Sequence, residues 1–303
     1  GGNIIMNKPL LKNLYTAIGL LFIAAFLLPQ QAEAQEENGL YLAGTAVTAE
    51  NCNDLSVIEG VSGKAQYDPA TKTLTLENAT IHSTQESGYV GGLTNNIDGL
   101  TIYLIGDNSI IADHREGIYN MFQKLLTIKG SGKLTIKGTT TSIILGTRYG
   151  IFNQGFITIN NCTIAVSGKD FGLCCGQWKF DRCNVRVQAP GSKAYQDSGS
   201  IASLHKKPEF IGCELSSPNG AYWKEYIIDP ICDHLYGIFG ADGKVVTDWV
   251  EIKKNTTGID EPTTKTPTST CGIYNLTGLK LDKPFEQQPA GIYIVDGVKK
   301  VKR

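Results

Sequence analysis

The segment that decides the fold reads Gly150-Ile-Phe-Asn-Gln-Gly-Phe-Ile-Thr-Ile-Asn-Asn-Cys-Thr-Ile164. It holds two short patterns in succession. The first is a Gly-apolar-x-Asn step at 150–153. The second is an apolar-x-apolar step at 157–159, followed after two spacers by a small residue and another apolar step. Alternating apolar side chains are typical of short β-strands, and the intervening Gly and Asn residues favour turns.

Both patterns recur along the chain, and they alternate. The first pattern starts at 92, 117, 150, 172, 200 and 220, and apolar anchors of the second stand at 76, 104, 128, 159, 180 and 210. Self-similarity at a period of about 20 to 33 residues is typical of solenoids. We therefore predict an all-β chain folded as a single-stranded, right-handed parallel β-helix of about six coils. An antiparallel sandwich also repeats its strands, but the constant order of the two patterns favours the solenoid.

Stacked coils bring equivalent residues into columns along the solenoid axis. We expect a column of small residues at a tight inward corner, made of Ala79, Cys162, Cys183 and Cys213. We expect a second column, in which stacked amides bond one another and the turn backbone, made of Asn95, Asn120 and Asn153. Apolar residues are expected to fill the space between, namely Ile118, Ile151 and Leu173.

Composition excludes several functional classes. The 28 Lys and Arg residues balance 29 Asp and Glu residues, for a net charge of −1, so the chain lacks the basic surface that nucleic acid requires. The eight cysteines show no paired C-x-x-C spacing with histidine partners, which argues against a zinc site. Neither a G-x-S-x-G motif nor a phosphate-binding loop is present. We expect no metal and no cofactor.

The N-terminus has the features of a secretory signal peptide. Residues 1–5 read as upstream sequence before Met6, Lys8 and Lys12 supply positive charge, and an apolar run follows at 17–28. A small-x-small cleavage signal ends at Ala34, so we expect residues 1–34 to be removed near Ala34–Gln35. A transmembrane anchor is the alternative, but twelve apolar residues span only about 18 Å as a helix. The prediction is a secreted or cell-surface protein, with outer-membrane association possible.

We expect the β-helix domain to span 35–250. Roughly residues 40–250 of it resemble the right-handed parallel β-helix proteins of secreted bacterial polysaccharide-active and adhesive families. Its opening part, Val61-Ser-Gly-Lys-Ala-Gln-Tyr-Asp-Pro-Ala-Thr-Lys-Thr-Leu-Thr-Leu-Glu-Asn-Ala-Thr-Ile81, is similar to bacterial surface proteins that contain a carbohydrate-binding domain. The resemblance implies a carbohydrate-binding, adhesin-like role. The motifs are structural, so they carry no catalytic residue with them.

The end of the chain carries a second resemblance. Residues 251–270 are polar and proline-bearing, which is typical of a linker. The segment 271–303 then shows two alternating strands, with Ile273-Tyr-Asn-Leu-Thr-Gly278, Pro289-Ala-Gly-Ile-Tyr-Ile294 and a basic end. It resembles the C-terminal sorting domain of type IX secretion, which implies secretion machinery as a partner. A small β-hairpin module that caps the chain is the alternative.

Four residues of the first pattern suggest a ligand-binding surface. If Ile118 and Ile151 point inward, the residues beside them point outward, so an aromatic pair would stack one coil apart with an arginine on each coil. Aromatic faces bordered by charged donors are suited to holding a sugar. The candidate binding residues are Arg115, Tyr119, Arg148 and Phe152. An exposed ladder stabilised by ring stacking alone is the structural alternative.

Catalysis has weaker support. Glycoside hydrolysis needs two carboxylates that converge across a bond, and no dense Asp/Glu group stands out. The candidates are Asp113, Asp170 and Asp181 as acid or base, with Arg148 as charge stabiliser. We rank binding of glycan or host surface without catalysis first, a polysaccharide lyase or glycoside hydrolase on the same scaffold second, and a structural envelope protein third.

Overall fold

The computed structural model describes residues 37–85, 91–139, 149–193, 195, 197–227, 234–255, 272–275, 279–295 and 298–302. The expected signal peptide at 1–34 and Arg148 lie outside these ranges. The chain divides into two compact units, Gly1–Asn255 and Thr256–Arg303. Each unit is described by itself.

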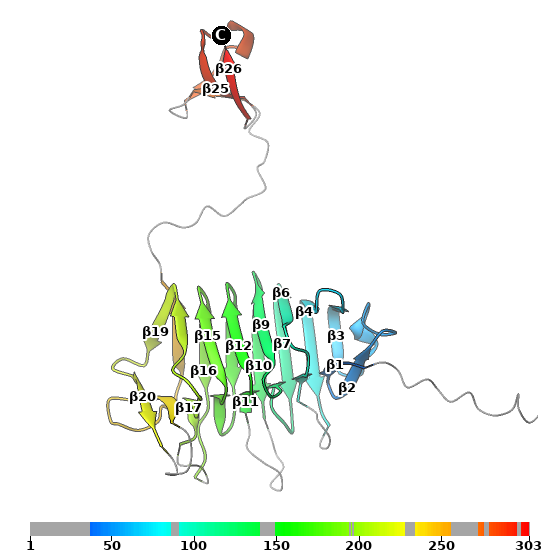
Figure 1. Cartoon of the computed structure of the whole chain (residues 1–303), viewed down its shortest axis with the longest axis vertical. Coiled ribbons are helices and arrows are strands. Elements are labelled where there is room, and N and C mark those ends of the chain that lie inside the picture. Colours follow the sequence, from blue (N-terminus) through cyan, green and yellow to red (C-terminus); the bar gives the residue numbers. More distant parts are fainter. Residues whose placement is uncertain are drawn as a thin grey trace, which may run out of the picture. The chain divides into compact units, whose positions relative to one another are not determined.

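The first unit is an all-β parallel solenoid of about four turns (Figure 1). Each turn contributes three short strands. The first turn contains β5 (Leu93–Asn95), β6 (Leu100–Ile105) and β7 (Asp107–Ala112). The second contains β8 (Ile118–Asn120), β9 (Leu125–Gly130) and β10 (Lys133–Gly138). The third contains β11 (Tyr149–Asn153), β12 (Phe156–Asn160) and β13 (Thr163–Ser167). The fourth contains β14 (Phe171–Cys174), β15 (Gln177–Asp181) and β16 (Asn184–Gln188).

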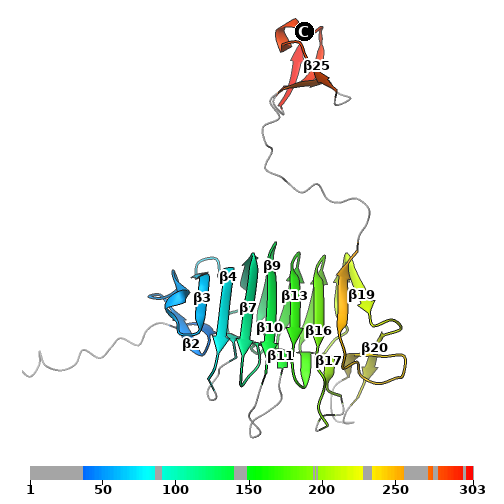
Figure 2. The ribbon, with the colours of Figure 1, turned by 180° about the vertical axis from the view of Figure 1, so that it is seen from behind.

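Equivalent strands of successive turns pair in parallel and form the walls. The first strands of the turns form one sheet, in the order β14-β11-β8-β5. The second strands, prominent in Figure 1, and the third strands, prominent in Figure 2, form two further walls. A single long strand, β4 (Thr73–Ser83), joins these two walls because its first half pairs with β6 and its second half with β7.

The N-terminal end of the stack is covered by antiparallel elements. The strand β3 (Val61–Asp68) pairs with β4, and β1 (Glu37–Leu42) pairs with both β5 and β2 (Thr45–Thr48). A short 3-10 helix, η1 (Leu55–Val57), buries Leu55 against the core. Terminal elements of this kind shield the apolar end of a solenoid and its unpaired strand edges.

The C-terminal end has fewer coils than the predicted six. A fifth turn begins with β17 (Gly199–Ala202) and β18 (Glu209–Ile211). The next strand, β19 (Cys213–Ser217), pairs antiparallel with β22 (Val250–Lys254), which lies between β16 and β19. Because β22 takes the edge of β16, the parallel stack cannot continue there.

The sixth copy of the first pattern, at Gly220, is therefore not a coil. Its residues lead into β20 (Tyr222–Tyr226), which forms an antiparallel hairpin with β21 (Leu235–Phe239). The first residues of the expected linker, 251–254, belong to a strand. The strand β22 continues to Lys254, and the compact unit ends at Asn255.

The expected apolar and asparagine columns are both confirmed. Ile118 pairs with Ile151 and Ile151 with Leu173, and all three are fully buried. The three asparagines of the second column are also fully buried and form a ladder, in which Asn95 Nδ2 donates to Asn120 Oδ1 at 2.8 Å and Asn120 Nδ2 donates to Asn153 Oδ1 at 2.9 Å. Each amide also donates to a backbone carbonyl of its own turn or the next, those of Ile97, Lys124 and Gln177.

The column of small residues is confirmed for its three cysteines and is wrong for Ala79. Cys162, Cys183 and Cys213 are buried, and each follows a residue with positive φ that turns the chain between two walls. The registers place Leu74 level with Ile102, Ile128 and Ile159, so Ala79 stands two positions past the level of Cys162. The sequence pattern does not reveal this shift. The single strand β4 passes through the corner, whereas in the later turns two separate strands meet there.

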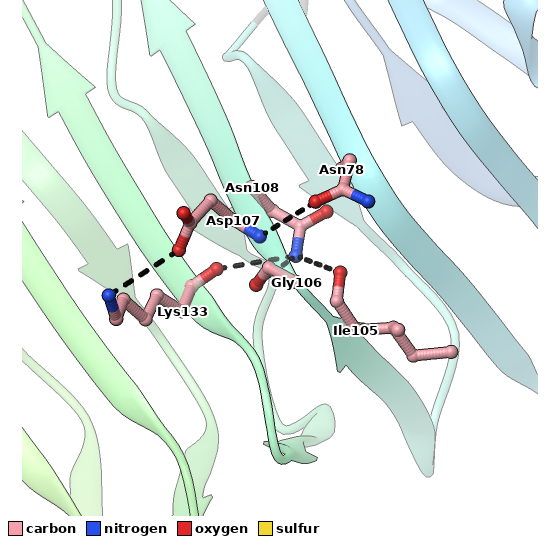
Figure 3. Close-up of polar contacts among 6 residues, drawn as sticks. All are labelled: Asn78, Ile105, Gly106, Asp107, Asn108 and Lys133. Atoms are coloured by element: carbon pink, nitrogen blue, oxygen red, sulfur yellow. Dashed lines mark hydrogen bonds and ion pairs between the residues drawn. The ribbon is translucent and has the colours of Figure 1, made fainter.

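In the first turn a buried asparagine, level with Leu134 and Ile164, bonds the backbone around the corner (Figure 3). Asn108 is buried, its Oδ1 accepts from the backbone N–H of Ala79 at 2.9 Å, and its Nδ2 donates to the carbonyls of Ile105, Gly106 and Lys133. Asn78 Oδ1 accepts from the backbone N–H of Asp107 at 3.1 Å. This network satisfies backbone groups that the tight turn removes from the sheet.

Replacing Asn120 by alanine should destabilise the solenoid. The substitution removes the central amide of the asparagine ladder. Asn95 Nδ2 then loses its acceptor and Asn153 Oδ1 loses a donor, at a cost of about 1–3 kcal/mol for each unsatisfied group. The midpoint of thermal unfolding measures the effect. Asn53→Ala, at an exposed asparagine, is the control and should leave the midpoint unchanged. Equal midpoints for the two variants would contradict the role of the ladder.

A bulky residue at Cys183 should also destabilise the protein, because the corner holds only a small side chain. Cys183→Phe overpacks the column, and overpacking typically costs about 1–3 kcal/mol. Cys183→Ala keeps a small residue there and serves as the matched control. Chemical denaturation of both variants checks the prediction, and a Phe variant as stable as the Ala variant would contradict it.

The second unit is a four-stranded antiparallel sheet in the order β24-β23-β25-β26. The segment expected as one strand at its start contains two, β23 (Ile273–Asn275) and β24 (Lys280–Leu281). After the 3-10 helix η2 (Phe285–Gln287), the segment expected as the second strand also contains two, β25 (Gly291–Val295) and β26 (Val298–Lys302), which pair antiparallel. Residues 256–271, which include most of the expected linker, lie outside the described ranges.

Candidate functional site

An aromatic ladder runs along the outer face of the wall formed by the first strands of the turns. Tyr119 and Phe152 stack one coil apart, as predicted, with ring centroids 5.3 Å apart and planes 20° apart. Phe152 stacks on Tyr149 at 4.5 Å, and Tyr149 stacks on Phe171 at 5.5 Å. The last ring, Tyr195, is tilted by 51° against Phe171.

The near-parallel stacking of the rings limits how well this aromatic ladder can bind a sugar. Rings that lie face to face along the solenoid axis cover one another's faces, so they present mainly their edges to solvent. A sugar stacks on an aromatic face, and such faces are therefore scarce on the ladder. Tyr119 is further fixed by its hydroxyl, which donates to Gln154 Oε1 at 2.7 Å. The geometry thus fits the structural alternative better, while Tyr195, tilted and 43% exposed, keeps an accessible ring.

The ladder rings should contribute to stability. Phe152 stacks on two neighbours, and each aromatic pair contributes about 0.5–1.5 kcal/mol beyond its buried area. Phe152→Ala should therefore lower the free energy of unfolding by at least about 1–3 kcal/mol. Phe122→Ala, at a phenylalanine that is 67% exposed, is the control and should have little effect in the same urea titration. A Phe152 variant that unfolds like the control would mean that the rings are not structural.

The remaining predicted residues of this wall are only partly placed. Arg115 is half-buried on the segment before β8. Arg148 lies outside the described ranges, so its expected position beside Phe152 stays a prediction. Asp170, two residues before Gly172, is buried at the start of β14.

The structure does not bring the candidate catalytic carboxylates together. Asp113 follows β7, and its Oδ2 lies 3.0 Å from His82 Nε2 in a half-buried contact. Asp170 follows the third strand of a later turn. Asp181 lies at the end of β15, on a different corner, where its Oδ2 accepts from Asn160 Nδ2 at 2.7 Å and its Oδ1 lies 3.0 Å from Arg182 Nε. Asp113 and Asp170 thus follow third strands that lie two turns apart, and a corner separates both from Asp181.

A large open cleft lies instead at the C-terminal end of the solenoid. It measures about 1110 Å³ and is lined by three segments, within 190–198, 224–227 and 239–247. The first is the loop after β16, the second ends β20, and the third follows β21. They meet because the β20–β21 hairpin folds back on the stack, where the backbone N–H of Tyr236 donates to the carbonyl of Leu204.

The cleft combines aromatic rings with positive charge. Tyr195, Tyr226 and Phe239 supply rings. Among the described residues, its charged lining consists of Lys193, Lys224, Lys244 and Asp197, three lysines and one carboxylate. Lys224 Nζ lies 4.6 Å from the centre of the Phe239 ring, a cation–π contact that holds the ammonium group at the cleft.

Two polar side chains of the cleft are held in place by Ser203. The hydroxyl of Ser203 donates to Asp197 Oδ2, and its backbone N–H donates to the Tyr226 hydroxyl at 2.8 Å. Burial raises the pKa of Tyr226 to about 12, so its hydroxyl keeps its proton at neutral pH. Asp197 and Tyr226 therefore offer an acceptor and a hydroxyl group from fixed positions.

Other kinds of site find no support within the described ranges. Among these residues, no group of three or more His, Cys, Asp or Glu side chains is placed to hold a metal ion. In the same part of the chain, no helix is both long enough and apolar enough to span a bilayer.

Analysis of the sequence missed the cleft residues because they follow no repeat. They belong to insertions between the repeated patterns, and only folding of the hairpin against the stack brings them together. The density of Lys and Tyr in these insertions is the sole sequence signal that could have suggested them.

The chain matches no family model, and the searches of curated proteins and of solved structures gave no match either.

Proposed function

We propose that the protein is a secreted or cell-surface β-solenoid that binds a glycan without catalysis, and that the glycan lies in the cleft lined by Tyr195, Tyr226 and Phe239. The observation that carries the proposal is the cleft itself, with the accessible ring of Tyr195, its lysines and its fixed polar groups. Ring faces pack against the apolar faces of sugars, and fixed polar groups direct hydrogen bonds to hydroxyls.

The size and charge of the cleft narrow the class of ligand. A volume of about 1110 Å³ accommodates a short saccharide segment, since small-molecule pockets commonly measure about 300–1,000 Å³. Among the described lining residues, Lys193, Lys224 and Lys244 outnumber the carboxylate of Asp197, which favours a glycan that carries carboxylate or sulfate groups. We therefore place the ligand here, and not on the ladder of Tyr119 and Phe152.

The resemblances of the two ends of the chain support the proposed location. A signal peptide at 1–34 would direct export, and the sorting-like segment at 271–303 would engage the secretion machinery. Display at the cell surface would present the cleft to polysaccharides or glycoproteins outside the cell. The second unit folds as a compact sheet, which suits a recognition signal that a transport apparatus reads.

Retention on a panel of immobilised polysaccharides, acidic and neutral, tests the proposal with the full mature chain. We expect retention by acidic glycans, weakened by salt because lysines contribute. Retention without release of unsaturated or reducing ends supports binding without catalysis. Release of unsaturated or reducing ends would contradict the proposal and identify the protein as a lyase or hydrolase. No retention on any polysaccharide would also contradict it and would favour a structural role in the cell envelope.

Variants in the cleft test where the glycan binds. Tyr195→Ala should weaken binding by about twofold to tenfold, the equivalent of the 0.5–1.5 kcal/mol that an aromatic contact contributes. Tyr103→Ala is the matched control, because Tyr103 is 40% exposed against 43% for Tyr195 and lies outside the cleft. Lys224→Ala and the exposed Lys207→Ala form a second matched pair.

The dissociation constant, measured by calorimetry on the best glycan of the panel, distinguishes the two surfaces. Loss of affinity in the cleft variants alone supports the cleft. If the cleft variants keep their affinity for the glycan and a folded Tyr119→Ala variant loses it, the glycan binds at the aromatic ladder and not in the cleft.

A further inference from the structure

Two adjacent cysteines lie at the end of β14 with their sulfurs in contact. Cys174 is the last residue of the strand, and Cys175 follows it with φ at +63°. Neighbouring side chains on an extended strand point to opposite faces. The left-handed conformation of Cys175 turns its side chain back toward Cys174, so the two Sγ atoms lie 3.2 Å apart.

The two thiols differ in their access to solvent. Cys174 is buried, whereas Cys175 is half-buried. The turn is anchored by Trp178, whose Nε1 donates to the carbonyl of Cys175 at 2.7 Å. A small reagent therefore reaches Cys175 first, and Cys174 lies directly behind it.

The surroundings favour a thiolate on Cys175. Hydrogen bonds from Cys174 and then from His205 lower the pKa of the Cys175 thiol, and burial raises the pKa of the Cys174 thiol. The cysteines of the corner column differ, because burial raises the pKa of Cys162 to about 12. Since the thiolate is the nucleophile, Cys175 is more reactive than Cys174 or Cys162.

We propose that Cys174 and Cys175 form a redox-active dithiol that closes to a vicinal disulfide by exchange with a low-molecular-weight disulfide. In the first step the Cys175 thiolate attacks one sulfur of the reagent, forms a mixed disulfide and releases one thiolate. In the second step Cys174, losing its proton to solvent, attacks the Cys175 sulfur and releases the second thiolate. The cysteine pair is oxidised by two electrons, and the reagent is reduced to two thiols.

Geometry makes the resulting bond labile. Consecutive Cα atoms are about 3.8 Å apart across a trans peptide, whereas bridged cysteines usually keep their Cα atoms about 4.4–6.8 Å apart. The eight-membered ring is therefore strained and easily reduced, as for disulfides with a regulatory role. The inference does not rest on the glycan-binding function, because it uses only these residues and their immediate contacts.

Differential alkylation of the full chain tests the proposal. The protein is equilibrated in buffers of graded reduced-to-oxidised glutathione ratio, alkylated and digested with trypsin. The peptide 170–179 lies between Lys169 and Lys179 and contains both cysteines and no other. In oxidising buffers we expect this peptide to lose two hydrogen atoms and to take up no alkyl group. Returning the protein to reducing buffer should reverse the change, while Cys162 stays a thiol throughout.

Two single substitutions separate the roles of the thiols. Cys174→Ser removes the resolving thiol, so Cys175 should be trapped as a mixed disulfide with glutathione. Cys175→Ser leaves the buried Cys174, which should acquire no glutathione. A peptide that takes up two alkyl groups at every ratio would overturn the proposal, as would a bond from either residue to a cysteine of another peptide. Glutathione on Cys174 but not on Cys175 would overturn the assigned roles. Circular dichroism of both variants confirms that they are folded.

Discussion

Register between successive turns is the constraint on which the whole solenoid depends. Side chains alternate between the interior and the outer face, so a slip of one residue would turn an apolar column outward. The buried amides of Asn95, Asn120 and Asn153 prevent such a slip, because two hydrogen bonds join them in series and each also donates to a turn carbonyl. Ile118 and Ile151 then meet in the core without any further specification.

The columns could be predicted from the sequence, because the same residue types return at the same place in each turn. The asparagine column and the apolar column follow from the Gly-apolar-x-Asn pattern alone. Ala79 was misplaced, since its pattern matches that of Cys162 while β4 passes the corner with a different spacing. Sequence similarity between repeats thus identifies the column type and leaves the register undetermined where the chain bends within one strand.

The end of the repeat and the cleft could not be predicted in the same way. Pairing of β16 with β22 joins residues such as Val187 and Val250, which are far apart in the sequence. A local sequence pattern does not predict such a pairing. The cleft residues Tyr195, Lys224 and Lys244 lie on three separate insertions. Their proximity is a product of the tertiary fold, whereas the stacking of Tyr119 on Phe152 follows from the repeat and was expected.

The antiparallel strand β22 also has a consequence for the height of the molecule. A parallel edge can accept another coil, either from the same chain or from a neighbouring molecule, and solenoids without terminal protection grow into fibres. The strand β22 runs antiparallel to β16 and is itself covered by β19, so on this wall no further coil can pair directly with β16. The position at which this strand docks, more than the number of repeats that the gene encodes, sets how tall the stack becomes.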